Sequence, residues 1–239
     1  MGTSSARRPP TTWFWRRAKG AASRYLSPEG GIGLEAREVV ARYLAALGED
    51  AGSGSQGLLA TFRLTRKVGQ NLGAFVGEVA SLGWEAALGA WGLSGAAGPP
   101  REMSAAVLAG ALMEADGSLE GAVARSSLVA VLQDFAASKQ AVPVQVVRRF
   151  LTETLYQRLV LDLGEPLEAA SLSFGHWRQA LEGLKGWIAG AAQEEPQAPP
   201  TPERWRGLAG WAWVTLTLEK MLGRLQGPSS PQTGAVEKT

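Results

Sequence analysis

The residues best suited to take part in a chemical reaction lie at the N-terminus, in the tetrapeptide Met1-Gly2-Thr3-Ser4. Methionine aminopeptidases remove Met1 before a small residue, which would leave a free amine on Gly2. An α-amino group has a pKa of about 8, so an appreciable fraction is neutral and nucleophilic near neutral pH. Glycine has no Cβ, so its amine can enter a narrow active site, and Thr3 and Ser4 add small hydrogen-bonding groups. We therefore expect Gly2, Thr3 and Ser4 to contact another protein.

A second candidate is the basic, aromatic segment that follows. Six positive residues precede the first acidic residue, Glu29; they are Arg7, Arg8, Arg16, Arg17, Lys19 and Arg24. Trp13, Phe14 and Trp15 lie among them. Arginines neutralise phosphates and tryptophans stack on bases, so this pattern is typical of a partner or nucleic-acid contact. We expect Arg7, Arg8, Trp13 and Trp15 to contact a partner; the alternative is that the aromatic residues dock onto the protein's own core.

Side chains for catalysis are few in this chain. It has no cysteine and one histidine, so a thiolate or histidine-rich metal site is excluded. That histidine, His176, stands beside Trp177, and we interpret it as a residue of a packed helix start. No Gly-x-x-x-x-Gly-Lys-Ser/Thr loop is present, which argues against an NTPase. Scattered carboxylates leave hydrolysis as an alternative, but we predict a chain that is not an enzyme and has no cofactor or metal of its own.

The overall composition is that of a globular protein. The 239 residues are 45% apolar and carry a net charge of +2, which gives little global attraction toward nucleic acid. No stretch of about 18 apolar residues lacks charges, and the N-terminus has no signal-peptide pattern. Together with the missing cysteines, these features predict a cytoplasmic protein that does not cross a membrane.

Apolar residues recur at three- and four-residue spacing along most of the chain, which predicts an all-α helical bundle. Glycine, proline and capping residues place the helix ends. The expected helices cover 34–47, two helices within 58–88, a short helix after Pro99-Pro100, Ser118 to Phe135, Pro143 to Gly164, 172–192, and a last helix from Thr201-Pro202 to Leu225.

Composition shifts predict four segments. Residues 1–26 would form a flexible basic tail that presents Gly2, and 27–51 a small helical unit. The run Gly52-Ser53-Gly54-Ser55 is typical of a linker, after which 55–226 would form the helical bundle. Residues 227–239 are expected to be disordered.

Two helices carry unusual faces. Gly69, Gly73 and Gly77 stand four residues apart, and mid-helix glycines at this spacing predict a close approach, either inside the protein or by a partner. The last predicted helix is apolar on two faces, one with Trp205 and the other with Trp211. It is either central to the bundle or half-covered by another protein, and we favour a partner contact through Trp211.

Four stretches resemble one protein family. They are the opening Met1-Gly2-Thr3-Ser4, L-M-E-A-D-G-S-L-E-G-A-V-A-R from Leu112 to Arg125, E-T-L-Y-Q-R-L-V-L-D-L-G from Glu153 to Gly164, and L-K-G-W-I-A-G-A from Leu184 to Ala191. On these residues the chain resembles QatB, over about residues 55 to 192 and the first four. The similarity is one of residue spacing and contains no catalytic signature.

The resemblance implies a role in bacterial anti-phage defence. QatB-like proteins act in the Qat system with an ATPase, a QueC-like enzyme and a TatD-like nuclease. The family's QueC-like enzyme is expected to join a deazaguanine base to the N-terminal glycine of its protein partner, which makes Gly2 the acceptor here. The alternative function is a nucleic-acid-binding adaptor that acts through the basic aromatic N-terminal arm.

Overall fold

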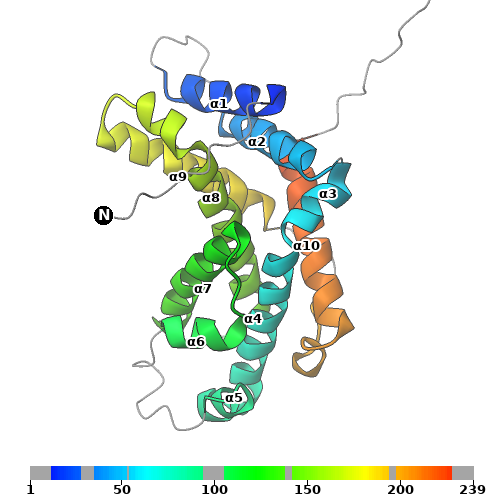
Figure 1. The fold of residues 1–239 in the computed structure, drawn as a ribbon. Helices are drawn as coiled ribbons and strands as arrows, with labels where there is room; N and C mark the ends of the chain where they lie inside the picture. Colours follow the sequence, from blue (N-terminus) through cyan, green and yellow to red (C-terminus); the bar gives the residue numbers. More distant parts are fainter. Residues whose placement is uncertain are drawn as a thin grey trace, which may run out of the picture.

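The computed structural model describes residues 12–27, 35–52, 54–93, 105–137, 142–193 and 198–227. Within these ranges it contains ten α-helices, one 3-10 turn and no strand, which confirms the predicted all-α fold (Figure 1). The elements are α1 (Trp13–Tyr25), α2 (Ala36–Asp50), α3 (Gly54–Thr61), α4 (Arg63–Leu82), α5 (Trp84–Ala90), α6 (Ala105–Leu112), α7 (Leu119–Ala137), α8 (Pro143–Ala169), α9 (Phe174–Ala191), η1 (Pro202–Arg204) and α10 (Leu208–Gln226).

Helix α4 is at the centre of the arrangement. Its buried residues Val68, Leu72, Phe75 and Val79 recur every three or four positions, so one stripe of the helix faces the core. It packs against α7, α8 and α10. Figure 1 shows α6 and α7 on one side of α4 and α10 on the other, with α1 and α2 across one end and α5 at the opposite end.

The described N-terminal residues correct the predicted flexible tail. Residues 13–25, which we placed in that tail, form helix α1, and the Thr12 side chain accepts a hydrogen bond from the backbone N–H of Trp15 as the N-cap. The helix packs along α2 and α8. Its buried face consists of Trp15 and three alanines, a stripe too weakly apolar to stand out within a basic segment. Residues 1–11 of the predicted tail lie outside the described residues.

Two predicted helix boundaries are wrong for identifiable reasons. Helix α8 does not stop at Gly164 but continues to Ala169, because Leu163 and Leu167 are fully buried and hold the last turns although Pro166 has no N–H to donate. The last helix does not begin at Pro202, which starts the short turn η1; α10 begins at Leu208. The segment 58–88 holds parts of three helices, where two were predicted.

Other boundaries follow the sequence signals. Ser118 caps α7, its hydroxyl accepting the backbone N–H of Gly121 at 3.0 Å, and Pro143 occupies the first turn of α8. Helix α2 packs against α1, α9 and α10, and the division into a unit at 27–51 and a bundle at 55–226 stays a prediction. Residues 228–239 lie outside the described residues. Over the described ranges, no helix combines the length and apolar composition that crossing a membrane requires.

Candidate binding site on the first two helices

The predicted site residues divide into two groups. Gly2, Thr3, Ser4, Arg7 and Arg8 lie outside the described residues, and their role stays a prediction. The structure places Trp13 and Trp15 on α1 and Trp211 on α10, so it does not bring these three together on one element.

Trp15 belongs to the protein's own core. Its side chain is 3% exposed, and its indole N–H donates a hydrogen bond to Asp50 at the end of α2, at 2.6 Å. Its ring lies edge-on to Tyr43, with centroids 6.0 Å apart. Trp15 therefore docks onto the protein's own core, and the predicted partner contact through this side chain is wrong. Trp15 instead fixes α1 against α2.

Trp13, in contrast to the buried Trp15, lies on the outer side of α1. It is 53% exposed, and the guanidinium carbon of Arg17 lies 4.5 Å from the centre of its ring, in cation–π geometry. A hollow of about 370 Å³ opens beside it, and we call this the α1 groove. Its lining consists of Trp13, Arg16, Arg17, Gly20, Arg24 and Arg42.

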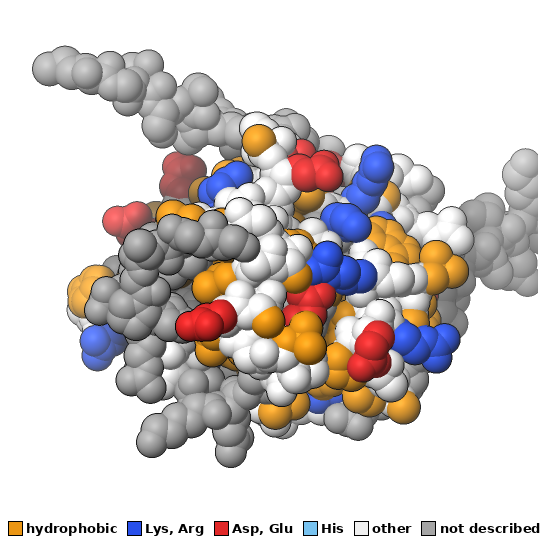
Figure 2. Space-filling model, turned by 90° about the horizontal axis from the view of Figure 1, so that it is seen from below, with side chains coloured by type: hydrophobic (Ala, Val, Ile, Leu, Met, Phe, Trp, Pro, Cys, Tyr) orange, Lys and Arg blue, Asp and Glu red, His pale blue; other side chains and the backbone are white. Residues whose placement is uncertain are grey.

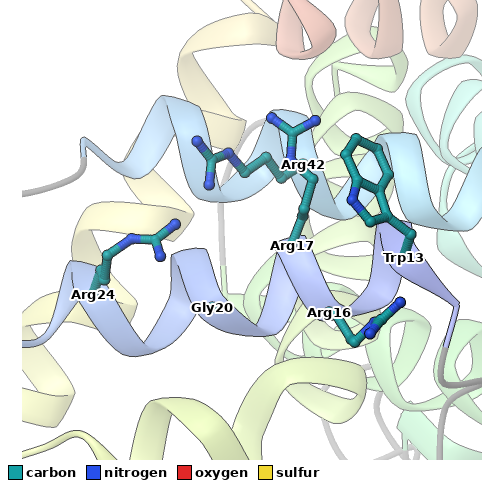
Figure 3. A pocket seen from close by; sticks show the side chains of 6 residues that line it. All are labelled: Trp13, Arg16, Arg17, Gly20, Arg24 and Arg42. Carbon is teal, nitrogen blue, oxygen red and sulfur yellow. The ribbon is translucent and has the colours of Figure 1, made fainter.

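The helix geometry explains this lining. Trp13, Arg17, Gly20 and Arg24 are spaced by four, three and four residues, so they share one face of α1. Figure 3 shows Trp13, Arg17 and Arg24 directed toward α2, where Arg42 lies, while Arg16 points to the other side of α1. The groove thus combines residues from two consecutive helices, and sequence reasoning did not find the contributions of Gly20 and Arg42.

Trp211 lies in a different environment. It is half-buried in the first turn of α10, and the guanidinium carbon of Arg66 lies 4.8 Å from its ring centre. The predicted second apolar face with Trp205 is not on this helix, because Trp205 precedes it and is buried against α4. The helix packs on α4 and α2 through one face that includes Val214, Leu218 and Leu222. A partner contact through Trp211 stays a prediction.

A comparison with protein-family models then decides the family. Residues 52–199 match the family described as "Qat anti-phage system associated protein QatB". The match covers more than half of the chain. The chain belongs to the QatB family. It therefore has a role in the Qat anti-phage system and acts with other components of that system. No curated protein and no solved structure matches the chain.

The QatB match and the α1 groove occupy different parts of the molecule. The matched residues run from α3 through α9, whereas α1, α2 and α10 lie outside them. Helix α2 nevertheless packs against α10 and α9, and α1 packs against α8. The groove is therefore a feature of the two N-terminal helices, which pack against the part of the chain that matches the QatB family.

The glycine stripe of this QatB-family chain serves internal packing. A Cβ added at Gly73 would lie 2.3 Å from the Trp205 ring, and one added at Gly69 would lie 3.1 Å from Val214. Gln70, on the same helix, donates from its amide to the carbonyl oxygens of Trp205, Arg206 and Gly207 at 3.2, 3.0 and 2.8 Å. The first of the two alternatives for this stripe is thus confirmed: α10 approaches Gly69, and the turn before α10 approaches Gly73. No sequence signal singled out Gln70.

A buried polar group ties α2 to α8. The Tyr43 hydroxyl donates to Asp162 at 2.9 Å, and the Arg158 guanidinium also contacts Asp162 at 2.9 Å. Burial raises the pKa of Tyr43 well above its ordinary value, and the neighbouring Asp162 carboxylate raises it further. The three side chains bond to one another within the fold, so we interpret the group as a structural contact between α2 and α8.

The last candidate residues are the single histidine and the scattered carboxylates. His176 lies in the first turn of α9, where its backbone N–H donates to the Ser173 hydroxyl at 3.2 Å, as expected for a helix start. Across the described portions of the chain, no three His, Asp or Glu side chains gather as metal ligands would.

Proposed function

We propose that this QatB-family chain is a protein substrate, and not an enzyme, of the Qat system. In this proposal a QueC-like enzyme joins a deazaguanine base to the amine of Gly2 after Met1 is removed. The family match over residues 52–199 is the observation that carries it. The ATPase and the TatD-like nuclease of the same system are proposed as further partners, and the base on Gly2 would be the chain's only cofactor-like group.

The chemistry of Gly2 supports this role. The neutral amine would attack a carbon of the base that the enzyme has activated with ATP. A carbon–nitrogen bond forms, the leaving group supplied by ATP departs, and the amine loses a proton. An amine pKa of about 8 makes the reactive form available near neutral pH. The missing side chain of glycine lets the nitrogen reach a carbon at the bottom of a narrow site.

The position of α1 adds a physical constraint to the proposal. Trp15 is buried and bonded to Asp50, so the chain is fixed to the body at the start of α1. Ten peptide units separate Gly2 from Thr12, and a fully extended chain of that length spans at most about 36 Å. An enzyme that acts on Gly2 must therefore bring its active site within that distance of the α1 groove.

Intact-mass measurement tests the proposal directly. The chain is co-expressed with the QueC-like enzyme and its base precursor, and the expected product is a des-Met chain heavier by the attached base, with fragmentation placing the addition on residue 2. Gly2→Val should remain unmodified because its β-branched side chain crowds the amine. Helix content measured by circular dichroism should be the same in both proteins.

Ala6→Val is the matched control, because it adds the same kind of bulk four residues later. It should be modified as the wild type is. An unchanged des-Met mass of the wild type after co-expression would contradict the proposal, and so would equal modification of Gly2→Val.

A further inference from the structure

The α1 groove has an open floor surrounded by cations. Gly20 forms this floor, and a Cβ added there would meet nothing closer than the Arg24 guanidinium at 3.7 Å. Arg17 and Arg24 stand one turn before and after Gly20 on the same helix face. The missing side chain at Gly20 therefore leaves space between two guanidinium groups that a small anionic group can enter.

The arginines that line the groove differ in their ion pairing. Within the part of the chain that the structure describes, no carboxylate forms an ion pair with Arg16, Arg17 or Arg24. Arg42 on α2 differs, because it is paired with Glu38. The surface seen in Figure 2, at the end of the molecule where α5 lies, carries positive and negative side chains interspersed. Arg16, Arg17 and Arg24, which have no carboxylate partner among the described residues, thus mark a local preference for anions that the net charge of +2 does not reveal.

An aromatic surface adjoins these cations. The Trp13 ring is more than half exposed and lies at the same end of the groove as Arg17. The exposed part of the indole is a flat apolar surface, and a planar base offers the matching surface. Arginine and tryptophan side by side are the groups that contact phosphate and stack on a base in proteins that bind single strands.

We propose that the α1 groove binds single-stranded nucleic acid. Arg17 and Arg24 contact consecutive phosphates, and Trp13 stacks on one base. Arg16, which points to the other side of α1, contacts a third phosphate where the strand leaves the groove. A single strand fits better than a duplex, because the bases of a duplex are stacked on one another and cannot lie on Trp13. The proposal goes beyond the modification of Gly2 and does not depend on it.

Fluorescence anisotropy with a labelled dT20 oligonucleotide tests the groove on the full chain. Three phosphate contacts predict that log K falls with log salt with a slope of about −2, since each contact on a single strand contributes about −0.7. The double variant Arg17→Gln/Arg24→Gln should reduce this slope by about 1.4 and weaken binding roughly 20-fold at 0.1 M salt. Trp13→Ala should weaken binding by about 5-fold or more through lost stacking.

Arg125→Gln is the matched control. Arg125 is an exposed arginine on α7, away from α1 and α2, so its loss removes a charge without touching the groove. The affinity of this variant for dT20 should stay within about twofold of that of the wild type, because salt screens the effect of one charge that lies far from the groove. Equal losses in Arg125→Gln and in the double variant would overturn the proposal, as would absence of dT20 binding by the wild type at low salt. Arg17→Lys/Arg24→Lys keeps the charges and should retain most of the affinity.

Two competitors identify the form of the ligand. Unlabelled dTMP should displace dT20 poorly at equal nucleotide concentration, because it offers one phosphate where the groove contacts several. A 20-base-pair duplex should also compete weakly. Displacement by dTMP as effective as by unlabelled dT20 would assign the groove to a free nucleotide and overturn the strand proposal, and so would duplex binding that Trp13→Ala does not change.

Discussion

Gly73 on α4 has no room for a side chain, and this makes it a sensitive residue for stability. A Cβ there would lie 2.3 Å from Cε3 of Trp205, whose ring is fully buried and cannot move away without disturbing its contact with Trp213. Overpacking of this kind destabilises a core by about 1–3 kcal/mol. Gly73→Ala should lower the free energy of unfolding by that amount, measured as a lower urea midpoint with an unchanged m-value.

A glycine-to-alanine substitution at an open position should instead raise the free energy of unfolding. Gly164 lies inside α8, and a Cβ added there meets nothing within 4 Å. Gly164→Ala should therefore stabilise the protein by up to about 1 kcal/mol, because alanine favours helix more than glycine does. If Gly73→Ala raised the midpoint as Gly164→Ala is expected to do, the close approach of Trp205 to α4 would be wrong.

Residue types alone revealed only part of the groove. Trp13, Arg17 and Arg24 stood out as a basic aromatic segment, because their types and spacing are local properties of the sequence. Arg42 comes from α2 and Gly20 matters only for the space it leaves, so both depend on how α1 lies against α2. Trp15 has the same type and charge surroundings as Trp13, yet one faces the core and the other faces outward. Only the packing of α1 separates the two roles.

At the level of the helices, the tie between α2 and α8 has a measurable pH dependence. Burial, together with Asp162, raises the pKa of Tyr43 above its unfolded value of about 10. The folded state thus disfavours the ionised phenol. The contribution of Tyr43 to stability is fully present below pH 10 and is lost as pH rises from 10 through the raised folded pKa.

Tyr43→Phe isolates this contribution. The variant should be less stable at pH 8 by about 1.5–3 kcal/mol, the usual net value of a hydrogen bond to a charged group. The difference between wild type and variant should shrink as pH rises above 10, because the variant has no phenol to ionise at this position. Urea unfolding at several pH values measures it, and a difference that stays constant to the highest accessible pH would contradict the raised pKa.

Helix boundaries were predictable where a local cap sets them and not where a distant contact does. Ser118 and Pro143 set the starts of α7 and α8 through groups within their own turns, and the structure agrees with both. The start of α10 depends on Gln70, which holds the three carbonyls before it and lies more than a hundred positions earlier in the chain. The end of α8 likewise depends on tertiary burial of Leu167. The spacing of residues in the sequence does not predict either of these tertiary contacts.

The whole molecule combines a QatB-family body with helices that the family match does not include. α1 covers parts of α2 and α8, and it buries Trp15 against Tyr43, a side chain with no exposed surface. Both the proposed acceptor, Gly2, and the proposed nucleic-acid groove are thus attached to the body through α1. A base attached to Gly2 would lie within about 36 Å of a strand in the groove, given the length of an extended segment.

Truncation separates the segment that carries Gly2 from the helix that anchors it. A chain that begins at Thr12 keeps every described contact of α1, so its urea midpoint should equal that of the full chain. A chain that begins at Pro28 loses Trp15 and exposes Tyr43, and it should be destabilised by at least about 3 kcal/mol, as for removal of a buried tryptophan. Both chains lack Gly2 and should gain no base in co-expression, whereas only the first should still bind dT20. Equal urea midpoints for the two truncated chains would show that α1 adds nothing to the body, and the anchoring role of Trp15 would have to be abandoned.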